Sequence, residues 1–125
     1  MQHQSGDNFI SLLLPKGLLD YFLLSRYTET EQDICLFLDE KNEVPAEYRN
    51  DKLTSKGFFD EITVQDFPLR GKAVFLHVRR RRWFNHTTGQ TVFRDWDMVA
   101  KGTRMTNEFA SFLKEISRYP SGKLQ

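Results

Sequence analysis

The sequence predicts one α+β domain: an antiparallel β-meander of about four strands, packed by an N-terminal and a C-terminal helix. Its 125 residues suffice for a single domain with one modest core. Eleven phenylalanines, four tyrosines and two tryptophans supply the bulky apolar groups that a disordered chain lacks. Period-two alternation dominates the middle of the chain, and helical spacing dominates its two ends. These features together predict helices that cover one face of a sheet.

The N-terminal part is predicted to be helical. Residues 1–7 are polar, and we expect them to be disordered. Asp7 or Asn8 could cap a short helix that ends before Pro15, because proline disfavours a helical residue in front of it. A second apolar face then repeats at i, i+1, i+4 and i+5, which is typical of a helix. We expect this second helix to pack on the sheet through Leu18, Leu19, Phe22 and Leu23.

The middle of the chain alternates between strand and turn patterns. The first predicted strand is "DICLFLDE", residues 33–40, in which apolar and less apolar positions alternate. Residues 41–51 read as a polar connection that contains one proline. The second predicted strand is residues 58–67. A turn follows at 68–71, where proline presets the backbone and glycine ends the turn.

The longest predicted strand is residues 72–84. A hairpin turn follows at 85–89, with glycine at its end, and residues 90–96 form the returning strand. Thr106 can cap a C-terminal helix that Tyr119-Pro120 would end. The apolar positions of this helix follow i, i+3, i+4 and i+7 and are Phe109, Phe112, Leu113 and Ile116.

The longest strand contains four consecutive arginines, in "VFLHVRRRRWF" (residues 74–84). Neighbouring residues of a strand point to opposite faces, so no single face can hold all four arginines in solvent beside the core. We therefore expect this strand to extend beyond the core as a basic hairpin arm, with Trp83 partly exposed. The predicted core comprises Ile62, Val64, Val74, Leu76, Val78, Phe109, Phe112 and Leu113.

The arginine run indicates a nucleic-acid interface. Arginine binds phosphate through two hydrogen bonds and stacks on bases, and a β-ribbon fits the major groove of DNA. The other interpretation is a solvated strand end whose arginines pair with the acidic first half of the chain. The candidate DNA-binding residues are Arg70, Lys72, Arg79, Arg80, Arg81, Arg82, Trp83, Arg94, Lys101 and Arg104.

The charge is divided unevenly along the chain, although the net charge is only +1. Residues 1–51 carry four Lys/Arg against ten Asp/Glu, and residues 52–125 carry fourteen against seven. Such asymmetry between halves is a pointer to nucleic-acid contact. Attraction between the two halves within one fold would also account for it.

The second half of the chain resembles a known family. "SKGFFDEITVQDFPLRGKAVFLHVRRRRWF" and "GTRMTNEFASFL" look like the N-terminal region of bacterial insertion-sequence transposases of the ISL type. More specifically, residues 8–119 are similar to short Bacteroidetes proteins described as the N-terminal region of an Aon-type insertion-sequence transposase. The residues that occupy the ISL-type motif are Asp66, Phe67, Pro68, Gly71, Val74, Leu76, Arg82 and Trp83.

The resemblance implies DNA binding at the terminal inverted repeats of the element, with catalysis in a separate or downstream domain. The alternative is a protein-interaction or regulatory piece that docks on a separately encoded catalytic subunit. ISL-type domains carry two Cys-x-x-Cys pairs, whereas Cys35 is the single cysteine here. His77 and His86 lack the paired spacing of a closed zinc site. We therefore expect a zinc-ribbon-like domain without a metal and without a cofactor.

The sequence does not predict an enzyme. Acidic residues are abundant, and Asp95 with Asp97 is the best candidate pair, but no triad spacing, nucleophile context or glycine-rich phosphate loop is present. No apolar run approaches the roughly 18 residues of a membrane span, and "FISLLLP" lacks the flanks of a signal peptide. A single cysteine excludes an internal disulfide and indicates a reducing compartment. We expect a cytoplasmic location.

Overall fold

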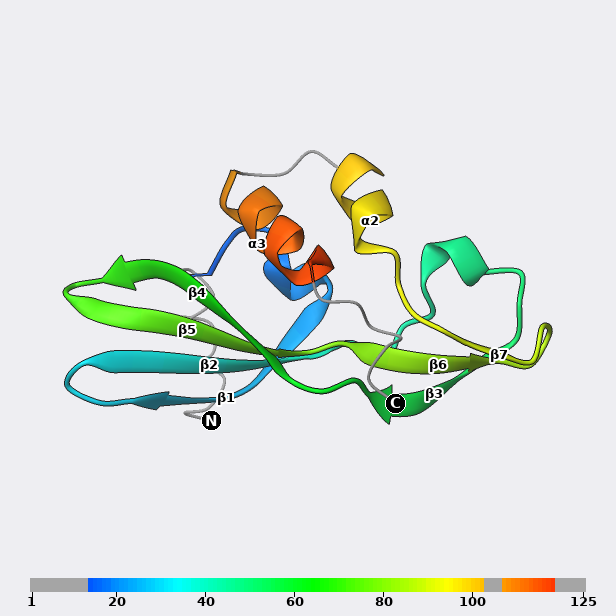
Figure 1. Cartoon of the computed structure of the whole chain (residues 1–125), viewed down its shortest axis with the longest axis horizontal. Helices are drawn as coiled ribbons and strands as arrows, with labels where there is room; N and C mark the ends of the chain where they lie inside the picture. The colour runs from blue at the N-terminus through cyan, green and yellow to red at the C-terminus, as the bar shows by residue number, and fades with distance from the viewer. Residues whose placement is uncertain (1–13, 103–106, 119–125) are drawn as a thin grey trace.

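The computed structural model describes residues 14–102 and 107–118 of the chain, and it confirms the α+β class (Figure 1). In these residues, seven strands form two sheets, one of four strands and one of three. Two α-helices and two short 3-10 helices complete the described fold. None of the described helices combines the length and the apolar character needed to cross a membrane.

The larger sheet has the strand order β1-β2-β5-β4. Its strands are β1 (Phe22–Glu29), β2 (Asp33–Glu40), β4 (Ile62–Leu69) and β5 (Lys72–Arg79). The pair β4–β5 is antiparallel, as predicted, and β1, which was not predicted, also pairs antiparallel with β2, but β2 and β5 run parallel. The predicted antiparallel meander is therefore wrong for the β2–β5 pair. After β2 the chain forms β3 in the smaller sheet, re-enters the larger sheet as the edge strand β4 and then forms β5 between β4 and β2, which a local turn pattern does not reveal.

The predicted N-terminal helix over residues 18–23 is wrong. The described segment contains one 3-10 turn, η1 (Leu18–Asp20), and then enters β1. Leu18 and Phe22 are still buried in the core. Their spacing of four residues therefore indicated burial correctly, but hydrogen bonds to β2 hold the chain extended from residue 22 onward.

The smaller sheet has the order β3-β6-β7. It is formed by β3 (Leu53–Phe58), β6 (Arg81–Asn85) and β7 (Gln90–Val92). The predicted strand 72–84 is split at Arg80, so that β5 belongs to one sheet and β6 to the other (Figure 1). The predicted hairpin turn before residue 90 is confirmed. The returning strand is shorter than predicted, because Trp96 begins a helix.

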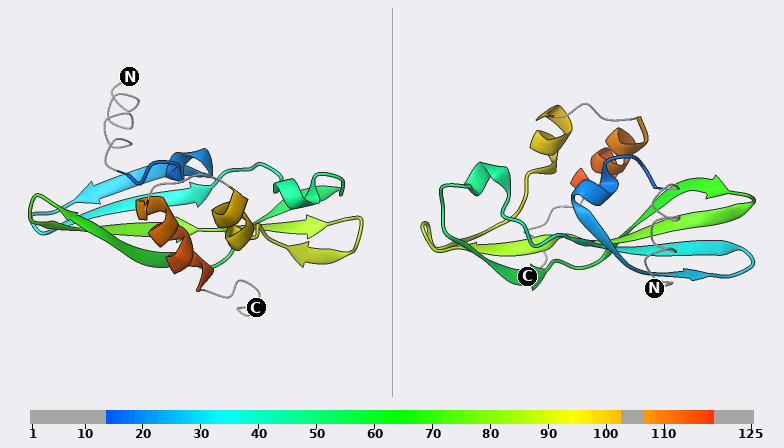
Figure 2. Two further views of the ribbon diagram at one scale, coloured as in Figure 1. Left: turned by 90° about the horizontal axis from the view of Figure 1, so that it is seen from above. Right: turned by 180° about the vertical axis from the view of Figure 1, so that it is seen from behind.

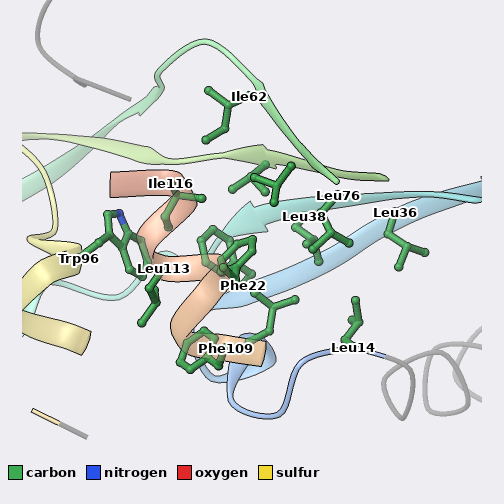
Figure 3. Packing of buried hydrophobic residues seen from close by; sticks show 14 of the residues in the cluster. Leu14, Phe22, Leu36, Leu38, Ile62, Leu76, Trp96, Phe109, Leu113 and Ile116 are labelled. Atoms are coloured by element: carbon green, nitrogen blue, oxygen red, sulfur yellow. The ribbon is translucent and has the colours of Figure 1, made fainter. Parts of the chain in front are cut away.

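The helices α2 (Trp96–Gly102) and α3 (Asn107–Ser117) lie on the same side of the molecule, α3 over the larger sheet and α2 over its junction with the smaller one (Figures 1 and 2). The apolar face of α3 is buried as predicted (Figure 3). Thr106 as the cap, Tyr119-Pro120 as the stop and residues 1–7 lie outside the described residues. All eight residues of the predicted core are buried. Trp83, predicted to be partly exposed, is only 2% exposed, so that prediction is wrong.

Candidate nucleic-acid interface

The arginine run lies at the junction of the two sheets. Arg79 ends β5, Arg80 links the strands, and Arg81 and Arg82 begin β6. The predicted basic arm beyond the core is therefore wrong. The strand instead passes from one sheet into the next, where the face of β6 that carries Trp83 is buried and the face that carries Arg82 is exposed.

Arg79 and Arg81 are engaged by groups of the chain itself. Arg79 forms a bidentate pair with Asp39, with Nε–Oδ1 and Nη2–Oδ2 distances of 2.7 and 2.8 Å, and this pair raises the pKa of Arg79. Arg81 donates to the Glu40 carbonyl oxygen at 3.2 Å and to Ser55 Oγ at 2.6 Å. Both guanidinium groups also lie against the Phe58 ring, 4.2 and 4.5 Å from its centre. Most of the donors of both side chains are thus used within the protein, and the charge of Arg79 is compensated by Asp39.

Three predicted DNA-contacting residues are buried. Arg80 is 2% exposed and Arg94 is 7% exposed, and Trp83 is covered as described above. Arg94 donates from Nε to Glu40 Oε2 at 2.8 Å and from Nη2 to the Glu43 carbonyl oxygen at 2.9 Å. In this structure, Arg80, Trp83 and Arg94 expose almost no side-chain surface to a phosphate, which corrects their place among the predicted contacts.

Glu40 is buried at the junction of the two sheets and links Arg81 to Arg94 through hydrogen bonds. Its carboxylate accepts the Arg94 side chain on one oxygen and the Arg81 backbone N–H, at 2.8 Å, on the other. Burial raises the pKa of Glu40, although Arg94 and the Arg81 hydrogen bond act in the opposite direction. Asp39 and Glu40 both come from the acidic first half of the chain. Attraction between the two halves therefore accounts for part of the charge asymmetry.

Arg82 is exposed, as Arg79 is, but unlike Arg79 it has no ion-pair partner among the described residues. Its Nε and Nη2 donate to the Lys56 carbonyl oxygen at 3.3 and 3.2 Å, which holds the guanidinium over the edge of β3. Its carbon Cζ lies 5.9 Å from the centre of the Phe59 ring. Arg82 is therefore a fixed, uncompensated cation at the surface.

Strand alternation places further cations beside Arg82. Thr54 pairs with Phe84 across β3 and β6, and Phe84 pairs with Thr91 on β7, so these three side chains share one face of the smaller sheet. Alternation places Arg82 on the same face, and the Arg82 hydrogen bonds to the Lys56 carbonyl oxygen place it beside Lys56 at the irregular end of β3. Just beyond the strands, His86 is hydrogen-bonded to Thr54 on this face, and its backbone N–H donates to the Lys52 carbonyl oxygen at 2.7 Å. We call this surface the basic face, and it consists of Lys52, Thr54, Lys56, Arg82, Phe84, His86 and Thr91.

The basic face contains no carboxylate, and neither Lys52 nor Lys56 forms an ion pair with a described residue. His86 is hydrogen-bonded to Thr54 and packs edge-on against Phe84, with ring centres 4.9 Å apart. The opposite face of the sheet, with Trp83 and Asn85, is buried. The exposed face thus combines uncompensated positive charge with one half-buried aromatic ring.

The remaining predicted contacts lie elsewhere. Arg70 is exposed at the β4–β5 turn, where its φ is 52°, at the opposite end of the molecule from β7 (Figure 1). Lys72 is near that turn and pairs with Glu29 at 2.6 Å. Lys101 lies in α2, but its side chain is outside the described part of the chain, as is all of Arg104. Of the eight predicted residues whose side chains the structure describes, it brings only Arg82 onto the basic face.

Sequence reasoning missed Lys52 and Lys56. The segment "KLTSKGF" (residues 52–58) lies between the predicted polar connection and the strand expected from residue 58, yet Lys52, Thr54 and Lys56 already follow the period-two pattern of a strand. Its single apolar position before Gly57 made the pattern weak. Only pairing with β6 shows which of its two faces is exposed.

Asp95 and Asp97, the best acidic pair in the sequence, lie at the start of α2 rather than on a strand. Asp95 Oδ1 accepts the backbone N–H groups of Asp97 and Met98 at 3.0 and 3.1 Å, as a helix-capping carboxylate does. Capping of α2 is a structural function that accounts for Asp95 at this position.

The described residues contain no group of three or more His, Cys, Asp or Glu side chains placed to hold a metal ion. Cys35 is half-buried on β2, and His77 Nδ1 lies 3.1 Å from Thr63 Oγ1 on the neighbouring strand. We predict that protein purified without added zinc contains well under one zinc per chain by elemental analysis. We also expect that a chelator leaves its melting temperature unchanged. Stoichiometric zinc would contradict this prediction.

Comparison of the chain with protein-family models, curated proteins and solved structures finds no match.

Proposed function

We propose that the chain is a DNA-binding module of an insertion-sequence transposase and that it contacts DNA through the basic face. The observation that carries the proposal is that Lys52, Lys56 and Arg82 share an exposed surface without a carboxylate. Phosphate neutralisation by such cations releases counterions and supplies much of the affinity for DNA. The motif resemblance described above supports the transposase context, in which the chain binds the terminal inverted repeats in the cytoplasm and catalysis belongs to another domain or subunit.

The local structure favours phosphate contact for a second reason. Arg82 is held by the Lys56 carbonyl oxygen, which lowers the conformational entropy lost when it binds. Thr91 adds an exposed hydroxyl group, which is a common donor to phosphate oxygens. By contrast, Arg79 is already neutralised by Asp39 and would have to break a bidentate pair before it could bind a phosphate.

The test is a triple alanine variant of Lys52, Lys56 and Arg82, assayed by fluorescence anisotropy across a salt series. The DNA would be the terminal repeat of the element and a scrambled duplex. We expect weaker binding to both, with the slope of log K against log salt flattened by about 2 to 3 units, because each lost phosphate contact contributes about 0.9. The melting temperature should change little, because these side chains are exposed.

A matched control removes the same charge from other surfaces. Lys16, Arg26 and Arg49 are exposed and outside the basic face, so their triple alanine variant has the same net charge as the test variant. It should keep most of the affinity and the salt slope. Equal losses in both variants would show an effect of net charge alone. Parental binding by the test variant would reject the basic face, and docking on a catalytic subunit would then be the better interpretation.

A further inference from the structure

A cleft of about 350 Å³ opens next to the basic face. Thr91 belongs to both surfaces, and the cleft extends from there along residues 92–97 to the C-terminal end of α3. Its volume is at the lower end of the range for pockets that bind small organic groups. Groups able to recognise a planar ligand line it, among them Tyr48, Phe93, Asp95, Trp96 and Asp97.

The cleft offers aromatic surface at its mouth. Phe93 is 39% exposed, although its ring is supported by an edge-on contact with Phe59 at 5.8 Å between ring centres. Trp96 lies deeper and is buried. Burial and the carboxylates of the neighbouring acidic residues raise the pKa of the Tyr48 hydroxyl, which therefore stays protonated and able to donate a hydrogen bond.

The charge of the cleft differs from that of the basic face. Asp95 and Asp97 are exposed carboxylates, and only Oδ1 of Asp95 serves to cap α2. Arg80 and Arg94 also reach the cleft from inside the fold, but Arg94 is neutralised by Glu40. Carboxylates repel phosphate and accept hydrogen bonds from the amino and imino groups of bases. The basic face is thus suited to the phosphate of a nucleotide, and the cleft is suited to its base.

We propose that this cleft receives an unpaired nucleobase while the adjoining phosphates lie on the basic face. The inference rests on the proposed function and names its substrate class: DNA with an unpaired strand, rather than fully paired duplex. A base inside a duplex is stacked on both sides and cannot enter a lateral cleft without being extruded. Binding of single strands generally combines a basic track with aromatic stacking, which is the arrangement found here.

The test compares a blunt duplex with the same duplex carrying a single-stranded overhang, by anisotropy at fixed salt. A third probe has an overhang of abasic nucleotides, which keeps the phosphates and removes the bases. We expect the overhang to increase affinity by about tenfold, the range that stacking of a base contributes. The abasic overhang should add much less.

Phe93→Ala is the diagnostic variant, and Phe67→Ala is its matched control. Phe67 is a 66% exposed phenylalanine on β4, outside both surfaces. We expect Phe93→Ala to lose the preference for the overhang while its affinity for blunt duplex and its salt slope stay unchanged, because no phosphate contact is lost. Phe67→Ala should behave like the parent. Melting curves would show that both variants are folded.

The possible outcomes separate this inference from the proposed function. Equal affinity for blunt and overhang DNA, or a preference that survives in the abasic probe or in Phe93→Ala, overturns the cleft proposal. The basic face would still stand if its triple variant weakens binding to the blunt duplex. Failure of the parent to bind any of the three probes overturns both.

Discussion

Replacing Phe112 by alanine should lower the free energy of unfolding by about 3–5 kcal/mol, the usual cost of truncating a buried phenylalanine. Phe112 lies on the inner face of α3 and is 3% exposed. Its ring meets Phe22 edge-on at 5.7 Å and stacks on Phe109 at 6.3 Å between ring centres. The loss removes contacts to both α3 and β1, so the surrounding side chains cannot close the cavity without moving an element of the fold.

Urea unfolding followed by circular dichroism measures this change. Phe67→Ala is again the control, because that exposed ring should contribute no more than about 0.5 kcal/mol. Similar midpoints for Phe112→Ala and the parent would show that α3 does not pack on the larger sheet as Figure 3 shows it. That result would also remove the C-terminal end of α3 from the wall of the cleft.

Removing the charge of Arg94 should be about as costly as truncating Phe112. Arg94→Met keeps most of the aliphatic volume but leaves Glu40 as a buried carboxylate without its side-chain partner. Breaking one side of a buried ion pair typically costs about 3–5 kcal/mol, because the remaining charge is desolvated and uncompensated. Urea unfolding at neutral pH should show a loss of this size.

A double variant separates the lost charge from the lost packing. Glu40→Gln combined with Arg94→Met removes both charges, and the glutamine oxygen can still accept the Arg81 backbone N–H. We expect the double variant to recover most of the stability that Arg94→Met loses. If the double variant is as unstable as the single one, Arg94 contributes through packing against Tyr21 and Trp96 instead.

The buried Glu40–Arg94 ion pair also predicts how the free energy of unfolding depends on pH. Burial raises the pKa of Glu40 in the folded state above its value in the unfolded chain. The folded protein therefore binds the Glu40 proton more tightly, and the stability that this proton contributes is lost as the pH rises through the raised pKa. Without Arg94 the pKa rises further, so the defect of Arg94→Met should shrink toward pH 4 and grow toward neutral pH. A defect independent of pH would contradict the uncompensated charge at Glu40.

The arginine run shows that a charged segment predicted to be exposed can form its contacts within the protein. Alternation excluded a single solvent face for the four arginines, and that deduction is sound. The conclusion that they project from the core is wrong because Asp39, Glu40 and two phenylalanines meet them at the junction of the sheets. The ion-pair partner of Arg79, Asp39, is forty residues away in the sequence, so no local pattern indicates it.

The sequence by itself determined the elements whose signals are local. The i, i+3, i+4, i+7 spacing of α3 and the alternation in β2, β4 and β5 identify buried faces without reference to the rest of the chain. All eight predicted core residues lie in these elements. The conversion of residues 22–29 to a strand, the parallel β2–β5 pair and the division of residues 72–84 at Arg80 were decided only by the tertiary structure. Each depends on hydrogen bonds or ion pairs between distant segments, and the free energy of such contacts is set by the folded neighbours rather than by local propensity. The basic face belongs to this second class, because pairing of β3 with β6 determines which lysines join Arg82 at the surface.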